Sequence, residues 1–179
     1  MATTFLALLR GVNVGQNALR MERLRELCAE MGFREARTYL QSGNLILQAR
    51  GTAAELSKAL EKKLAGETRL PVTVIVRRVE EIRGVLTANP LLGQRGIDPS
   101  KLHVTFLREA PEKSPVEALR KIAAGADEFR WAGTEIYLHC PAGYGETKLS
   151  NAALERILGM RATTRNWRTV TKLCDLCSG

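Results

Sequence analysis

The sequence predicts an α+β protein built from two similar halves in tandem. In each half, a short apolar strand is followed by an amphipathic helix, two strands, a second helix and a fourth strand. This βαββαβ order is that of a ferredoxin-like unit with an antiparallel sheet. A stretch with helix- and strand-breaking residues, NPLLGQRGIDPS, separates the halves at residues 89–100. We therefore expect two tandem ferredoxin-like lobes joined by a linker at residues 90–100.

The first half supplies each expected element in chain order. An apolar run predicts the first strand, and an apolar stripe at helical spacing predicts the helix after it. A capping box formed by Thr52 and Glu55 predicts the start of the second helix. The expected elements are the strand 5–9, the helix 20–32, the strands 36–40 and 44–49, the helix from Thr52, the strand 72–78 and an extra helix 79–88. The first lobe with its extra helix therefore spans residues 1–89.

The second half repeats this plan over residues 101–179. Ser114 and Pro115 mark a helix start, with proline at the first helical position. The expected elements are the strand 102–108, the helix from Ser114, the hairpin strands 127–133 and 134–140, the helix 150–159, the strand 161–165 and a C-terminal helix 166–177. Because the halves share little sequence identity, the proposed duplication depends on the order of the elements.

The central strands of the first half are apolar on both faces, whereas two helices can cover only one face of a sheet. The other face, which carries either Leu6 and Leu8 or their neighbours Phe5, Ala7 and Leu9, must therefore meet something apolar. The candidates are the extra helix 79–88, the C-terminal helix and the sheet of the other lobe.

The composition indicates a globular protein with a core and a basic surface. The 179 residues are 45% hydrophobic, which is enough to build one domain or two small lobes. The formal net charge is +8, and residues 147–173 contain six Lys or Arg side chains against one acid, Glu155. Such a segment indicates an anionic partner such as a phosphate, a nucleic acid or an acidic protein face. A solvated basic surface explains it equally well.

No segment has the pattern of a signal peptide or a membrane span. The early apolar run at residues 5–9 is too short for a signal peptide and has no basic segment before it. No other run approaches the length of a membrane span. The four cysteines show no evenly spaced disulfide framework. These features predict a cytoplasmic protein that does not bind a membrane.

Two polar, glycine-bearing stretches predict a ligand site in the first half: LLRGVNVGQN at residues 8–17 and QSGN at residues 41–44. With the strand order 4-1-3-2 of a ferredoxin-like sheet, the end of the first strand and the turn between the second and third strands lie at one edge. We therefore expect the two stretches to meet at the N-terminus of the first helix. The candidate ligand-binding residues there are Arg10, Gly11, Asn13, Gly15, Ser42, Gly43 and Asn44.

An anion is the ligand that this first cluster would suit. Free backbone amides and the helix dipole favour negative charge at a helix N-terminus. Glycines let a ligand approach the backbone, and Arg10 adds a planar fork for phosphate or carboxylate. The alternative is structural, with glycines in a strained turn, Asn13 bonded to its own backbone and the second stretch forming a hairpin turn.

The same topology predicts a second cluster, in the second half. It brings the loop PAGYGETKLS, at residues 141–150, to the edge where the strand 161–165 ends, so Lys148, Arg165, Asn166 and Trp167 should be neighbours. Lys148 is then either a solvated side chain or a point charge for an anion. For Asn166 the alternative role is the N-cap of the last helix, and for Trp167 it is a core position.

The sequence contains no recognisable catalytic machinery. Strand alternation places His103 and His139 on one face of the second sheet, together with Thr105 and Tyr137. A contact face toward the other lobe or a dimer partner explains this group better than a titratable patch does. No nucleophile lies beside a base, so no catalytic residue is assigned and the question of enzymatic activity stays open.

A zinc site is not expected. His139 and Cys140 are adjacent on a strand and point to opposite faces, and Cys174 and Cys177 belong to the apolar stripe of a helix. We therefore predict no metal site and assign no cofactor.

Four motifs give the chain a resemblance to a known family over nearly its whole length: LLRGVNVGQN, RTYLQSGN, GYGETKLSN and TTRNWRTVTKL. They resemble the bacterial family known as domain of unknown function 1697. The resemblance implies a two-lobed, ferredoxin-like protein, but no reaction, because none is established for the family. The motif positions here are Arg10, Gly11, Asn13, Gly15, Ser42, Gly43, Asn44, Lys148, Asn166 and Trp167. Gln16, Ala18 and Thr147 depart from the family pattern.

The leading hypothesis is a cytoplasmic protein that binds a small phosphate- or carboxylate-bearing ligand, with or without catalysis. Nucleic-acid binding through the basic C-terminal segment is the second hypothesis. It is less favoured because RNA-binding sheets of this topology present aromatic side chains on an open face, whereas the first sheet is apolar on both faces. The third hypothesis is a non-catalytic interaction or oligomerisation module, including a homodimer.

Overall fold

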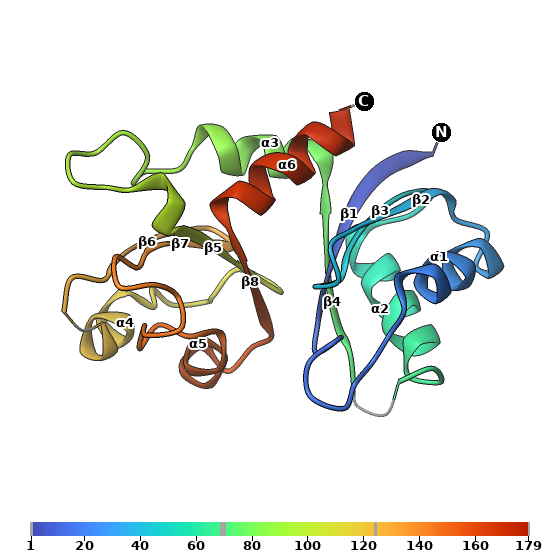
Figure 1. Ribbon diagram of the computed structural model, residues 1–179, viewed down its shortest axis with the longest axis horizontal. Helices are drawn as coiled ribbons and strands as arrows, with labels where there is room; N and C mark the ends of the chain where they lie inside the picture. The colour runs from blue at the N-terminus through green and yellow to red at the C-terminus, as the bar shows by residue number, and fades with distance from the viewer. Residues whose placement is uncertain (1, 69–70, 124, 179) are drawn as a thin grey trace. The chain divides into compact units, whose positions relative to one another are not determined.

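The computed structural model describes residues 2–68, 71–123 and 125–178 and confirms an α+β fold with two four-stranded antiparallel sheets (Figure 1). The chain divides into two compact units. Unit 1 consists of Met1–Arg83 together with Leu173–Gly179, and unit 2 consists of Gly84–Lys172. The lobe boundaries expected from the sequence stay a prediction.

Unit 1 has the sheet order β2-β3-β1-β4, and every neighbouring pair of strands is antiparallel. Its elements are β1 (Thr3–Arg10), α1 (Met21–Glu30), β2 (Arg34–Tyr39), β3 (Asn44–Ala49), α2 (Ala53–Leu64), β4 (Thr73–Arg78) and the start of α3 (Val79–Thr87). The expected capping box starts α2: the Thr52 amide donates to the Glu55 carboxylate at 2.7 Å, and the Glu55 amide donates to the Thr52 hydroxyl at 3.2 Å.

The core of unit 1 lies between the sheet and the helices α1 and α2, which cover one face of it (Figure 1). Phe5, Ala7 and Leu9 of β1 point to this face. Leu24, Leu27, Leu56 and Leu60 of the two helices pack against them, all nearly or fully buried. Alternation along the strand therefore sends Leu6, Leu8 and Arg10 to the opposite face.

The opposite face of the unit 1 sheet is also covered, as expected from its apolar strands. Leu6, Leu8, Ile46 and Ile75 on this face are all buried. The chain's last residues belong to unit 1, although they are far from it in sequence. A guanidinium nitrogen of Arg37, on β2, donates to the Leu176 carbonyl in the last turn of α6 at 3.0 Å.

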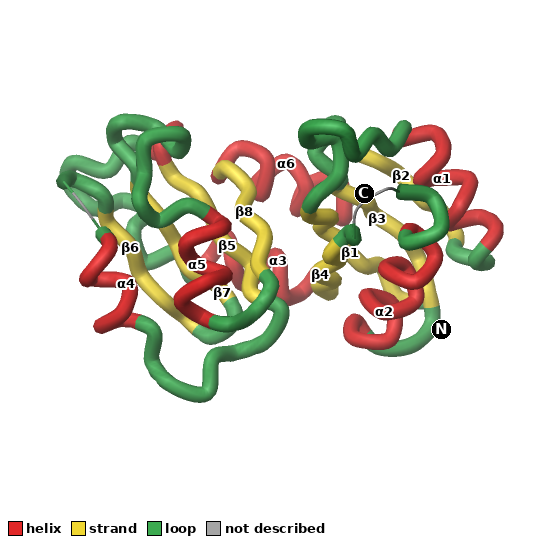
Figure 2. Tube along the Cα trace, turned by 90° about the horizontal axis from the view of Figure 1, so that it is seen from below, coloured by secondary structure: helices red, strands yellow, loops and turns green. Residues whose placement is uncertain are grey.

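Unit 2 has the sheet order β6-β7-β5-β8, again with antiparallel neighbours. Its elements are the end of α3, a 3₁₀ turn (Pro99–Lys101), β5 (Leu102–Leu107), α4 (Val116–Ile122), β6 (Glu128–Ala132), β7 (Glu135–His139), α5 (Asn151–Leu158), β8 (Ala162–Asn166) and most of α6 (Trp167–Ser178). Figure 2 shows α4 and α5 on the same face of this sheet, where Leu107, Leu119, Ile136, Leu138 and Leu154 form the core.

Most element boundaries differ by one or two residues from those expected, and two of the differences have a clear physical reason. Strand β2 ends at Tyr39 because Leu40 has a φ of +59°, which leaves the strand conformation. Helix α4 begins at Val116, one residue later than expected, and Pro115 is its N-cap.

The two sheets carry the same row of side chains on the face opposite their helix pair. In unit 1 the row across the four strands, read from the strand pairing, is Arg37, Ile46, Leu6 and Arg77. In unit 2 the corresponding row is Arg130, Tyr137, Val104 and Arg165. Each row has an arginine on both outer strands and large side chains on the inner two. In each row, the two side chains on the inner strands are buried, and so is the arginine on the last strand, Arg77 or Arg165.

No helix in the part of the chain that the structure describes could span a membrane, since none is both long and apolar enough.

Candidate functional site

The first polar stretch and the turn QSGN contact each other, which confirms the expected meeting of the two loops. The Asn13 side-chain amide donates to the Gln41 carbonyl at 2.7 Å. Next to it, the Leu9 amide donates to the Gly43 carbonyl at 2.8 Å. The two loops therefore form one surface at the end of β1.

Asn13 fixes the shape of this surface. Its carboxamide oxygen accepts the Leu19 amide at 2.8 Å, and its nitrogen donates to the Leu19 carbonyl at 3.0 Å as well as to Gln41. Its φ of +53° is one that asparagine tolerates better than most residues. Both polar atoms of the Asn13 side chain are thus hydrogen-bonded to backbone groups of the two loops. The bonding of Asn13 to the backbone, which was the structural alternative to a ligand contact, is therefore observed.

Inside the loop, residues Val14–Asn17 form a tight turn closed by a 3.1 Å bond from the Asn17 amide to the Val14 carbonyl. Gly15 occupies the first central position with a φ of +56°, which glycine adopts without steric cost. In the described chain, the backbone amides of Gly15 and Gln16 have no hydrogen-bond acceptor. The turn therefore presents two free N–H donors on an exposed loop.

Asn17 is a structural residue of this loop that the sequence did not single out. Its side chain is 1% exposed, and its amide nitrogen donates to the Gly11 carbonyl. Its carboxamide oxygen is buried without a partner among the described residues. Only the abundance of asparagine in the stretch could have suggested this role.

Gly43 and Asn44 are structural parts of the second loop. A Cβ at Gly43 would lie 2.6 Å from Val12 Cγ2 and 2.7 Å from Leu9 Cβ, so the close packing of the loops requires glycine. Asn44 is fully buried, and its side-chain amide donates to the Tyr39 carbonyl at 2.8 Å and to the Ser42 hydroxyl at 3.0 Å. Ser42 itself is exposed.

Strand alternation assigns Arg10 and Asn44 to the face of the sheet opposite α1 and α2. Arg10 follows Leu9, which faces the helices, and so belongs to the opposite face of the sheet. Asn44 pairs with Leu8 on that same opposite face. The gathering of these residues around one ligand therefore stays a prediction, and the sheet contributes Arg10 and Asn44 from the face that α1 and α2 do not cover.

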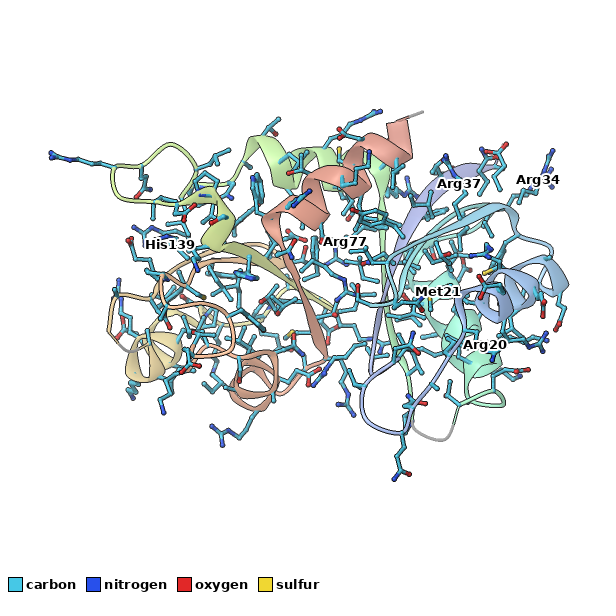
Figure 3. All side chains as sticks on the ribbon, in the orientation of Figure 1. Arg20, Met21, Arg34, Arg37, Arg77 and His139 are labelled. Carbon is cyan, nitrogen blue, oxygen red and sulfur yellow. The ribbon has the colours of Figure 1, made fainter. Side chains whose placement is uncertain are left out.

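The N-terminus of α1 already holds a carboxylate. Arg20, at the N-cap position, makes no capping hydrogen bond through its side chain. The carboxylate of Glu22 accepts its own backbone amide, and this bond, followed by the Arg25 side chain, lowers the pKa of Glu22. The helix dipole therefore has an internal anion, which weakens the case for an external one at this end. Figure 3 shows Arg20 and Met21 at the start of the helix.

In unit 2, the loop that contains Lys148 is held by its neighbours. The Thr147 hydroxyl donates to Asp127 at 2.5 Å and accepts the Leu149 amide at 3.0 Å. The Tyr144 hydroxyl accepts the Asn151 amide, at the start of α5, at 2.9 Å. Lys148 is exposed and makes no hydrogen bond or ion pair with any described residue.

The other predicted residues of the second cluster have separate roles. The Asn166 side chain accepts the Thr169 amide at 2.8 Å, which is the capping role considered for it. Trp167 is half-buried at the first position of α6. Arg165 is 9% exposed and donates to the Thr163 hydroxyl at 2.8 Å and to the Thr164 carbonyl at 2.9 Å. Burial lowers the pKa of Arg165 to about 10.

The two histidines lie on opposite faces of the unit 2 sheet, so the expectation of a shared face was wrong. His103 pairs with Leu138, which faces the helices, whereas His139 pairs with Leu102 on the other side. The offset between β5 and β7 decides this, and alternation within each single strand cannot reveal it. His139 is buried, with Nε2 accepting the Asp98 amide at 3.2 Å and Nδ1 without a partner among the described residues.

His103 stacks on Tyr144, with ring centroids 4.8 Å apart. On the same face of the sheet as His103, a chain of hydrogen bonds that the sequence did not predict runs from the Thr105 hydroxyl to the Thr164 hydroxyl at 2.8 Å, and on to the Asn151 carboxamide at 3.1 Å. The members of this network satisfy each other, so it supports the position of α5 on the sheet.

The stacked His103 should make the stability of the protein depend on pH. Burial lowers the pKa of His103, so the unfolded chain binds the proton more readily than the folded chain does. This contribution is complete above the unfolded value of roughly 6.5 and is lost as the pH falls below it. The variant His103→Phe keeps a ring stacked on Tyr144 but cannot bind a proton. Between pH 7.5 and pH 5.5, urea unfolding should therefore show a smaller loss of stability for this variant than for the wild type. An equal loss in both proteins would contradict this role.

The structure offers no metal centre within the residues that it describes, since no three His, Cys, Asp or Glu side chains gather there. Burial raises the pKa of Cys177 to about 11 and also raises that of Cys174. These thiols are therefore protonated near neutral pH and are poor nucleophiles and metal ligands.

The chain matches the model of the family described as Protein of unknown function (DUF1697) over residues 2–137. The chain belongs to this family. The matched range contains both loops of unit 1 and ends before the Lys148 loop. No curated protein matches the chain significantly. Among solved structures, a conserved bacterial protein from Streptococcus pneumoniae is similar in fold, with a TM-score of 0.80 and 21% identity over 100% of both chains.

Proposed function

We propose that this protein binds a small phosphate- or carboxylate-bearing ligand at the tight turn Val14–Asn17. The observation that carries the proposal is the pair of free backbone N–H donors at Gly15 and Gln16 on a loop whose shape is held by Asn13. Backbone donors held in a turn bind anions without paying for the ordering of flexible side chains.

Arg20 is the cation proposed for the same anion. It follows Leu19, whose backbone is bonded at both ends to the Asn13 side chain, so its own backbone is tied to the loop. Its side chain is exposed. This assignment replaces Arg10, which belongs to the opposite face of the sheet. Lys148, exposed and unpaired, stays a proposed anion contact of unit 2 in its own right.

A small anion is favoured over nucleic acid as the ligand. The basic segment 147–173 was the basis for the nucleic-acid hypothesis, and its Arg165 is buried. The remaining bases of the segment come from a loop, from α5, from the β8 approach and from α6, rather than from one element. Binding by such a segment would also weaken steeply with salt, which distinguishes it from binding at a built turn.

The proposal is tested by titrating the ¹⁵N-labelled protein with inorganic phosphate at low ionic strength. The amide signals of Gly15 and Gln16 should move, and Arg20→Gln should weaken the affinity about tenfold, the value of one charge-assisted hydrogen bond. Arg50→Gln, which removes another exposed arginine, after β3, is the matched control and should bind as the wild type does. The proposal fails if neither amide responds to phosphate at millimolar concentration.

We also propose that each unit is a ferredoxin-like repeat followed by one further helix, and that the protein acts in the cytoplasm. The repeat is supported by the strand orders β2-β3-β1-β4 and β6-β7-β5-β8, which correspond strand by strand. The matching rows that end in Arg77 and Arg165 give independent support, because a row depends on strand register as well as on element order.

A further inference from the structure

Two large aliphatic side chains lie exposed beside the turn. In the described part of the chain, the large apolar side chains with high exposure are Val14, Leu40 and Leu92. Val14 is 58% exposed and follows Asn13, and Leu40 is 52% exposed and precedes Gln41. Because Asn13 and Gln41 are joined by a 2.7 Å hydrogen bond, Val14 and Leu40 flank the same contact between the loops.

Leu40 has a left-handed backbone conformation that is unfavourable for a leucine side chain. Its φ of +59° is one that Gly or Asn adopts more readily than a bulky residue does. Its exposure also means that the leucine side chain gains little from burial in return. Folding alone therefore does not account for leucine at this position, whereas contact with a ligand would.

We propose that the anion bound at the turn carries an apolar group, making the ligand an amphiphilic phosphate or carboxylate. The inference rests on the proposed function. The charged group binds the amides of Gly15 and Gln16 and the Arg20 guanidinium, and the hydrocarbon part covers Val14 and Leu40. Only two exposed large aliphatic side chains of the described chain flank this contact, so the ligand class is one with a short alkyl chain rather than a long acyl chain.

The experiment compares inorganic phosphate with methyl, butyl and hexyl phosphate, followed by calorimetry and by the amide signals of Gly15 and Gln16. Affinity should rise with chain length, by up to about fourfold for each methylene that is removed from water. The gain should level off when the chain extends beyond the patch. Alkyl phosphates of each length carry the same charged group, so the comparison isolates the apolar contribution.

Three variants locate the apolar contact. Val14→Thr keeps the shape of the side chain but adds a hydroxyl, and Leu40→Asn replaces leucine with a residue suited to the left-handed conformation. Both should reduce the preference for butyl phosphate over inorganic phosphate to less than about a third of the wild-type ratio. Leu40→Asn should at the same time raise the melting temperature, because it relieves backbone strain. Leu92→Asn, in the linker, is the control and should keep the wild-type ratio.

The outcomes separate this inference from the proposed function. If phosphate binds at the turn but all chain lengths bind equally, the apolar contact is refuted and the anion site survives. If neither phosphate nor any alkyl phosphate binds, both proposals fail. If the alkyl preference persists in Val14→Thr and Leu40→Asn, the hydrocarbon binds elsewhere and the inference is overturned.

Discussion

Replacing Gly43 with alanine is expected to destabilise the protein by about 3 kcal/mol, the sum of a left-handed alanine and an overpacked contact. The new Cβ would lie 2.6 Å from Val12 Cγ2 and 2.7 Å from Leu9 Cβ, both buried and unable to move aside freely. The φ of +78° adds strain that does not depend on the available space. For a chain of this size, the melting temperature should fall by roughly 10 °C.

Gly15→Ala is the matched control for this prediction. Gly15 also has a positive φ, of +56°, but no atom lies within 4 Å of the position that a Cβ would take. The loss should then be confined to backbone strain, about 1 kcal/mol. Equal losses in the two variants, measured by urea unfolding, would show that the packing of Leu9 and Val12 against the turn has little effect on stability.

The order of the elements and the meeting of the two loops could be predicted from local signals. Apolar periodicity and the Thr52–Glu55 capping box depend on neighbouring residues, and these parts of the fold were confirmed. The contact between Asn13 and Gln41 followed from topology, since the strand order 4-1-3-2 brings the two loops to one edge of the sheet. Such inferences need only the chain order and the type of each element.

The atomic roles in the site could not be predicted in the same way. Asparagine at positions 13 and 44 is equally suited to a ligand or to its own backbone, and only the packed loop shows that Asn13 and Asn44 bond internally. Likewise, the faces of His103 and His139 depend on the register between β5 and β7, which is set by the chain between them and not by either strand. Register and packing are therefore the missing information.

The burial of Arg165 is a further case in which composition misleads. A run of six bases suggests an exposed basic surface, yet Arg165 is enclosed and bonded to Thr163 and Thr164. Its counterpart in the other sheet, Arg77, is also buried. Strand alternation combined with coverage of both faces encloses these arginines, and neither feature is visible in a count of charges.

The association of the chain's last residues with unit 1 has the largest expected effect on folding. Leu173 is 1% exposed and Cys174 is 6% exposed, and the Leu176 carbonyl accepts the bond from Arg37. A chain that ends at Lys172 removes all of these groups while keeping every strand of both sheets. Losing one buried leucine alone costs about 2–5 kcal/mol, so the truncated chain should lose at least that much stability.

The loss should be concentrated in unit 1. Amide hydrogen exchange should accelerate in β1 to β4 of the chain that ends at Lys172, and the dye ANS should bind, because Leu6, Leu8 and Ile46 lie on the face that this unit must cover. A chain that ends at Asn89 also lacks Leu173–Gly179 and should remain molten or aggregate. A chain that ends at Leu176 is the control, since it keeps Leu173, Cys174 and the acceptor for Arg37, and it should remain close to the wild type in stability. A well-dispersed, monomeric spectrum from the chain that ends at Asn89 would mean that unit 1 covers its second face without the C-terminal residues.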